Sequence, residues 1–214
     1  MNTQVRFRGR RDVPLDSVGR AEALAVGRGL TRVSLEAVYT SPLSRAREVA
    51  IAIAAAAGLE NIEDAEGLIN LDYGHWEGLT KEECAAHDPD AFRLYAEAPE
   101  VAVCPGGEAL ADAADRIVAT LQEIGGRHPG GSVAAVTHGA MVRLAVLRTA
   151  GSVEGDWQFK LPTGSATVFE VVDSDVRLAS VIDRTCPDPV KAAAGDTAQP
   201  AGATGGLRST IVNG

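Results

Sequence analysis

The amino-acid sequence predicts an α/β fold, a three-layer sandwich with a mostly parallel central sheet. Segments with helical periodicity alternate with short β-rich runs along most of the chain, which is typical of this class. Residues Val133 to Val136 are apolar without a polar break, as in a strand buried on both faces. The chain has 214 residues, 45% of them hydrophobic, which suffices for one domain with a full core. We expect this domain to occupy residues 1–185.

The first helix is expected after an irregular N-terminal segment. Asp16 or Ser17 can cap a helix that runs to about Arg28. Helical spacing predicts four inward-facing side chains in it: Val18, Ala21, Leu24 and Ala25.

The other elements follow from periodicity and turn signals. The sequence predicts a strand at 35–39, a helix at 43–57 ended by Gly58, a short strand within 59–71, a helix after the capping box at 80–83, a helix at 89–98, an amphipathic helix at 110–124, a strand and helix at 132–150, and a hairpin of 166–172 and 176–182. Residues 186–214 are rich in Ala, Gly and Pro, which predicts a flexible tail.

Composition narrows the range of partners. The formal net charge of −9 argues against nucleic acid and anionic membranes, although a few local arginines can hold a small phosphorylated ligand. The three cysteines are scattered without metal-binding spacing, which favours free thiols in a reducing cytoplasm. The longest apolar run is too short to span a bilayer, and the N-terminus lacks the apolar core of a signal peptide. We therefore expect a cytoplasmic protein without a membrane partner.

The stretch 132–145 organises the predicted site. A buried strand is followed directly by His138 and Gly139, and helical spacing begins at the next residue. This order places the imidazole of His138 at the carboxyl edge of a parallel sheet, where ligands of open α/β sheets bind. The new helix points free N–H groups to the same edge, which favours an anion. The simpler alternative is that His138 only ends a strand.

Arginines gather at two further places. Arg45 lies in the first turn of the helix at 43–57, at a second strand-to-helix junction. Near the N-terminus four arginines crowd around Gly9: Arg6, Arg8, Arg10 and Arg11. Such a segment is typical either of a solvated loop or of a small anion-binding surface.

Five motifs along the chain occur together in a known order. They are Arg6–Leu15, Tyr39–Ala46, Leu71–Gly78, Pro105–Glu108 and Val136–Gly139. With these motifs the chain resembles the histidine phosphatase family, the phosphoglycerate-mutase-like superfamily. The resemblance covers residues 2–170, and the tail has no counterpart in it.

The resemblance implies a phosphoglycerate-mutase-like sandwich and phosphoryl transfer without metal or cofactor. In this family a histidine takes the phosphoryl group and passes it to water, or back to the substrate in mutases. Two histidines and two arginines hold the phosphate, and a carboxylate protonates the leaving oxygen. Neutral imidazole is a good nucleophile near pH 7, and guanidinium groups offer fixed donors to phosphate oxygens.

Several residues of this chain match family positions. Arg45 matches the phosphate-binding arginine, with a solvated helix arginine as the alternative, and His138 matches the second histidine. The matching motifs also predict substrate-binding residues near the phosphate: Asn2, Arg8, Gly9 and Gly139. No chemical role is assigned to Glu108.

Two departures bear on activity. The family's nucleophilic histidine ends a strand a few residues before the position of Asn2, where this chain has only Met1. The proton-donating glutamate falls at Asn70, whose amide can hydrogen-bond a phosphate oxygen but cannot protonate a leaving group. We therefore place Asn70 at the catalytic position. Asp72, on the same side of an extended segment, is a substrate-binding candidate and the alternative proton donor.

Three explanations for the missing strand stay open. The native chain starts upstream of Met1, which we favour; or the protein is a decayed paralogue that binds phosphorylated ligands without turnover; or another segment fills the gap in the sheet. The β-like piece of the tail, Leu207–Val212, is the candidate for that segment. The other histidines are expected in loops or at the surface: His75, His87 and His128.

The predicted function is a metal-independent phosphomonoesterase scaffold for a small phosphorylated metabolite or inorganic phosphate. Without the nucleophilic histidine, the chain is expected to be inactive or weakly active. The alternatives are a non-catalytic phospho-ligand-binding protein, a mutase, which the short segment between Gly78 and Pro105 disfavours, and an interaction protein that acts through its tail. We expect no cofactor, no metal and no nucleic acid partner, and a homodimer is compatible with the sequence.

Overall fold

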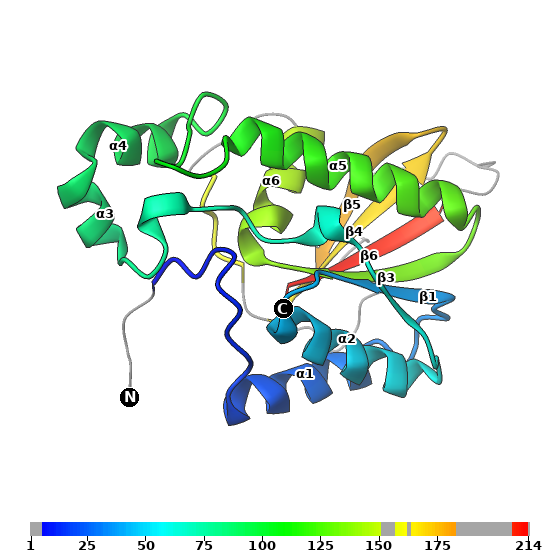
Figure 1. The fold of residues 1–214 in the computed structure, drawn as a ribbon. Coiled ribbons are helices and arrows are strands. Elements are labelled where there is room, and N and C mark those ends of the chain that lie inside the picture. Colours follow the sequence, from blue (N-terminus) through cyan, green and yellow to red (C-terminus); the bar gives the residue numbers. More distant parts are fainter. Residues whose placement is uncertain (1–5, 151–156, 162–163, 183–206, 214) are drawn as a thin grey trace.

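The structure is a computed structural model that describes residues 6–150, 157–161, 164–182 and 207–213. Its main elements are α1 (Ser17–Gly29), β1 (Ala37–Thr40), α2 (Ser44–Ala57), β2 (Ile62–Asp64), α3 (Lys81–His87), α4 (Pro89–Glu97), α5 (Leu110–Arg127), β3 (Ser132–Thr137), α6 (Gly139–Ala150), β4 (Ala166–Val172), β5 (Asp175–Ile182) and β6 (Leu207–Asn213) (Figure 1). In the described part, every helix is too short or too polar to cross a membrane.

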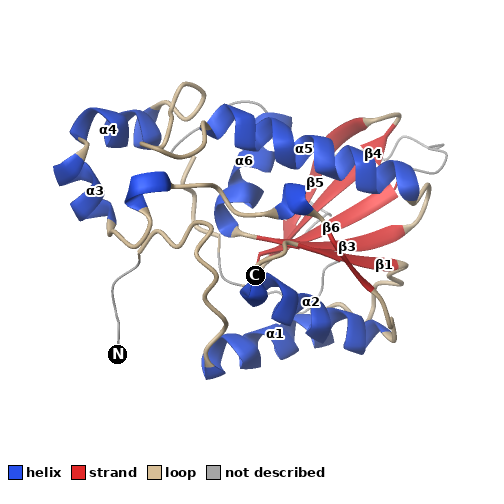
Figure 2. Ribbon diagram, in the orientation of Figure 1, coloured by secondary structure: helices blue, strands red, loops and turns tan. Residues whose placement is uncertain are grey.

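One six-stranded sheet forms the middle layer, in the order β2-β1-β3-β6-β4-β5. The strands β2, β1, β3 and β6 run parallel, and β4 is antiparallel to both β6 and β5. Helices α1 and α2 cover one face of the sheet, and α5 and α6 cover the other (Figure 2). This architecture confirms the predicted three-layer sandwich with a mostly parallel sheet.

Strand β3 is buried on both faces, as its unbroken apolar sequence predicts. Val133 and Ala135 belong to the core beneath α5 and α6, whereas Ala134 and Val136 belong to the core beneath α1 and α2. Successive side chains of a strand point to opposite faces, so four apolar residues in a row serve both cores. His138 therefore follows a strand that is fixed on both sides.

The boundaries of α1 agree with the sequence, but its predicted inner face is wrong. The Asp16 side chain accepts a hydrogen bond from Gly19 N at 2.8 Å and caps the helix, as expected. Val18 and Leu24, however, are 64% and 56% exposed. The buried face instead includes Gly27, where an added Cβ would lie 2.5 Å from Ala52 O of α2. Ala23 and Val26 share this buried face, and the absence of a side chain at Gly27 lets the two helix backbones approach closely.

Most other elements lie where the sequence predicts them. Thr80 and Glu83 form the capping box that starts α3, and Gly58 ends α2 with a φ of 71°. The hairpin of β4 and β5 turns through Asp173 and Ser174, whose φ angles of 50° and 67° suit a tight two-residue turn.

The largest difference concerns the C-terminal segment, which the sequence placed in a flexible tail over residues 186–214. Residues 207–213 form β6 inside the sheet, between β3 and β4. Of the three explanations for the missing strand, this arrangement is the third, in which a later segment fills the gap. Residues 1–5, including Asn2, and 183–206 lie outside the described part of the chain.

Candidate functional site

A cavity of about 350 Å³ opens at the sheet edge where β1 and β3 end. Its lining includes Arg6, Phe7, Arg8, Arg45, Asn70, Tyr73, Lys81, Tyr95, His138, Gly139, Ala140, Arg143, Trp157 and Gln158. Five of these described residues are Arg or Lys, and none is Asp or Glu. The local charge is therefore positive in a protein whose formal net charge is −9. Such a cavity favours an anionic ligand.

Arg45 is the most buried cation of this cavity, with 3% of its surface exposed. It lies in the first turn of α2, whose Ser44 N donates to Asp12 Oδ1 at 2.8 Å. Its guanidinium donates to Arg11 O and to Gly9 O, each at 2.8 Å. Burial and nearby Arg8 lower the pKa of Arg45, but an arginine stays protonated at neutral pH. Both recorded hydrogen bonds of this buried cation go to carbonyl oxygens, not carboxylates.

His138 is placed at the end of β3 and is 3% exposed. Its Nε2 shares a hydrogen bond with Ser41 Oγ at 2.8 Å. Burial, with Arg45 and Arg116 nearby, lowers its pKa from 6.5 to about 3. The imidazole is thus neutral at pH 7 and can share a hydrogen bond with a phosphate oxygen.

Ser41 is a site residue that the sequence analysis missed. It follows β1 directly, and β1 pairs in parallel with β3 through Thr40 and Val136. The carboxyl ends of parallel neighbours meet at the same edge, so the position of Ser41 beside His138 could have been predicted from the two junctions.

Gly9 joins the N-terminal segment to the site. Its carbonyl oxygen accepts from Arg45 and, at 3.1 Å, from Asn70 Nδ2. The φ of Gly9 is 53°, and an added Cβ would lie 1.9 Å from Glu77 Oε1, so a larger residue would be strained there and would displace the Glu77 side chain. Gly9 therefore acts through its backbone: it holds Arg45 and Asn70, both at the cavity, in one network.

Of the remaining predicted site residues, some line the cavity and others do not. Arg8, Asn70 and Gly139 line the cavity. Asp72 is absent from the described lining: its Oδ1 accepts from Gly74 N at 2.9 Å, and its Oδ2 lies 3.4 Å from Arg10 Nη1. The structure thus gives the alternative proton donor no place at the cavity. Asn2 lies outside the described residues.

Three of the four histidines lie away from the cavity, as the sequence predicts. His128 Nε2 shares a hydrogen bond with Tyr39 OH at 2.7 Å, His75 packs against Gly106, and His87 ends α3 at the surface. None of the three is among the described residues that line the cavity. His138 is therefore the one histidine that the site holds.

The far wall of the cavity is aromatic, and the sequence analysis did not identify it. Phe7 and Tyr73 have ring centroids 4.5 Å apart, and those of Tyr95 and Trp157 are 5.0 Å apart. Burial raises the pKa of Tyr73 to about 12, so its hydroxyl stays neutral. Arg143 Nε donates to the backbone of the segment 157–161 at 2.8 Å. This wall joins segments far apart in the sequence, which no local motif reveals.

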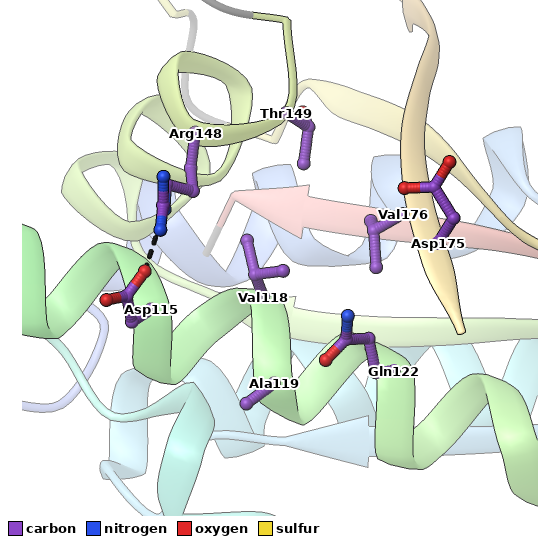
Figure 3. Close-up of a pocket in the computed structure, with 8 residues that line it drawn as sticks. All are labelled: Asp115, Val118, Ala119, Gln122, Arg148, Thr149, Asp175 and Val176. Carbon is purple, nitrogen blue, oxygen red and sulfur yellow. Dashed lines mark hydrogen bonds and ion pairs between the residues drawn. The ribbon is translucent and has the colours of Figure 1, made fainter.

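A second hollow lies between α5, α6 and the start of β5 (Figure 3). Its lining includes Asp115, Gln122 and Arg148. Arg148 Nε donates to Asp115 Oδ1 at 2.7 Å, so the cation of this hollow is already paired. It also lies away from both strand-to-helix junctions, and we place the functional site at the first cavity.

The family comparison covers most of the chain. The model of the histidine phosphatase superfamily, branch 1, matches residues 1–184. Phosphoserine phosphatase 1 of Hydrogenobacter thermophilus is 31% identical over 167 residues, which cover 78% of this chain and 79% of the relative.

Two solved structures are similar to this chain in fold and in sequence. YhfR of Bacillus stearothermophilus matches at a TM-score of 0.71 with 32% identity, over 81% of this chain and 87% of that one. A mycobacterial glucosyl-3-phosphoglycerate phosphatase matches at 0.69 with 26% identity, over 81% and 88% respectively.

Proposed function

Because the chain belongs to the histidine phosphatase superfamily, we propose that its cavity binds a small phosphomonoester, with the phosphoryl group between Arg45 and His138. The observation that carries this proposal is the buried guanidinium of Arg45, whose recorded hydrogen bonds all go to carbonyl oxygens. A buried charge is stable only when it is compensated. The carboxylates of Asp12 and Glu77 attract the Arg45 guanidinium without a hydrogen bond to it, and a phosphate would add negative charge in direct contact. Arg8 and the first N–H groups of α6 add donors on the same side.

The same residues suggest slow turnover. His138 is the single histidine at the cavity, and none of the described lining residues is a carboxylic acid. Among the described lining residues, a phosphoryl transfer therefore finds neither a second imidazole nor a carboxylic acid to protonate the leaving oxygen. We propose that the chain binds phosphomonoesters and hydrolyses them weakly or not at all with these residues alone. The relatives named as phosphoserine and glucosyl-3-phosphoglycerate phosphatases make their phosphoesters the first ligands to test.

The test is calorimetric titration of the full chain with inorganic phosphate and with vanadate. Arg45→Ala removes charged hydrogen bonds worth about 1.5–3 kcal/mol each, so we expect a loss of affinity of at least about tenfold. Arg47→Ala is the matched control: Arg47 lies in the same helix but pairs with Asp64 at the surface, and its loss leaves the affinity unchanged. Equal affinities of wild type and Arg45→Ala would contradict the proposal.

Hydrolysis of p-nitrophenyl phosphate tests the second part. We expect a rate close to the uncatalysed background for the chain. Turnover of about 1 s⁻¹ or more, the usual range for enzymes, would contradict this part of the proposal, and its survival in His138→Ala would show that the reaction takes place without His138.

A further inference from the structure

Strand β6 lies inside the sheet, with a hydrogen-bonded strand on each side. It pairs in parallel with β3 from Ser132↔Arg208 to Thr137↔Asn213, and antiparallel with β4 from Ala166↔Val212 to Val171↔Leu207. Figure 1 shows it in red between the two halves of the sheet. It is therefore a central strand that comes from the last residues of the chain.

β3 depends on this pairing. One edge of β3 bonds to β1, and in the described structure its other edge bonds to β6. Without β6 the sheet divides into β2-β1-β3 and β4-β5. The freed N–H and C=O groups of β3 and β4 would then lie between helix layers, where unpaired backbone groups are costly.

The end of β6 lies at the candidate site. Asn213 pairs with Thr137, the residue before His138, and Thr40 of β1 ends at the same edge. Three strands thus end side by side at the cavity, and β6 holds the strand that carries His138 from the side opposite β1.

We propose that residues 207–213 are a positioning element of the phosphate site: β6 completes the sheet and fixes the end of β3, so that His138 and Arg45 face one cavity. The effect of β6 on phosphate binding rests on the proposed function, whereas the position of β6 in the sheet does not.

Hydrogen–deuterium exchange of the full chain tests the placement directly. Amides of 207–213 should exchange at least about a hundredfold more slowly than in an unstructured chain, together with those of β3 and β4. Exchange of 207–213 at the unstructured rate, with β3 and β4 still protected, would overturn the proposal. This measurement needs no variant and no ligand.

A pair of variants at Thr210 tests the effect on the site. Thr210 pairs with Ala134 of β3 and Val168 of β4, and proline removes its N–H while valine keeps the N–H and favours a strand. We expect Thr210→Pro to speed exchange in 132–137 and 166–171 at least about tenfold and to weaken phosphate binding by a similar factor. Thr210→Val should change neither quantity.

The outcomes separate the two proposals. If Thr210→Pro loosens β3 but phosphate affinity stays at the wild-type value, β6 has no positioning role. If wild type itself binds no phosphate while 207–213 is protected, the proposed function fails and the sheet placement stands. Should Thr210→Pro fail to fold, the milder Thr210→Gly, which keeps the N–H but weakens a strand, takes its place in the full chain. It should speed exchange in 132–137 and weaken phosphate binding relative to Thr210→Val; equal values for the two variants would contradict the proposal.

Discussion

The buried imidazole of His138 makes a quantitative prediction about stability and pH. Burial, with Arg45 and Arg116 nearby, lowers its pKa from 6.5 to about 3 in the folded protein, while the unfolded chain keeps the ordinary value. Between these two pH values the unfolded state binds a proton at His138 and the folded state does not. The free energy of unfolding therefore falls as the pH is lowered from about 6.5 towards about 3.

The size of the effect follows from the linkage relation. Each pH unit below 6.5 costs about 1.4 kcal/mol, so at pH 4.5 the contribution of His138 is about 2–3 kcal/mol. Urea unfolding in acetate and MES buffers, free of phosphate, measures this quantity. In His138→Gln the stability should decline about 2–3 kcal/mol less than in wild type between pH 7 and pH 4.5.

The control variant is His87→Gln, because His87 is exposed at the end of α3. Its pH profile should run parallel to that of wild type, since an exposed side chain meets nearly the same solvent surroundings in the folded and in the unfolded chain. Carboxylates contribute equally to all three proteins and cancel in the comparison. Parallel profiles of wild type and His138→Gln would refute the argument, because they would show that the imidazole titrates as an exposed one does.

Three further outcomes are expected. Arg8→Gln removes a cation from the cavity lining, so calorimetry should show about three- to tenfold weaker phosphate binding with a smaller dependence on salt; an unchanged affinity would place Arg8 outside the site. Asp72→Asn should leave phosphate affinity as in wild type, because the Asp72 carboxylate accepts from Gly74 N and is not part of the described cavity lining. A large loss of affinity would show that Asp72 belongs to the binding site after all. Gly27→Ala should lower the free energy of unfolding by about 1–3 kcal/mol in urea, since the added Cβ meets Ala52 O at 2.5 Å, and a stabilised variant would show that α1 and α2 separate easily.

The sequence predicted the parts of the site that local order determines. A buried strand followed by His138, and a second junction followed by Arg45, must meet at one edge if the strands are parallel, and the structure brings both residues to one cavity. The caps of α1 and α3 are equally local, because a capping side chain bonds to a backbone group three residues away.

Long-range contacts explain what the sequence analysis did not predict. The sequence offered Leu207–Val212 only as one of three open explanations, because its pairing with β3 spans 76 positions and the Ala-, Gly- and Pro-rich segment before it is typical of a tail. The inner face of α1 depends on how closely α2 approaches, so a face with Ala23, Val26 and Gly27 is buried in place of the predicted one. Trp157 reaches the aromatic wall from a loop with no periodic pattern.

A crystal structure of the full chain, soaked with vanadate at a concentration that calorimetry shows to be saturating, would show directly whether Arg45 and His138 form one anion site. We expect vanadate oxygens within hydrogen-bonding distance of the Arg45 guanidinium and of His138 Nε2, with Ser41 Oγ released from its present bond to the imidazole. An anion bound elsewhere on the protein, with Arg45 still bonded only to Gly9 O and Arg11 O, would contradict it.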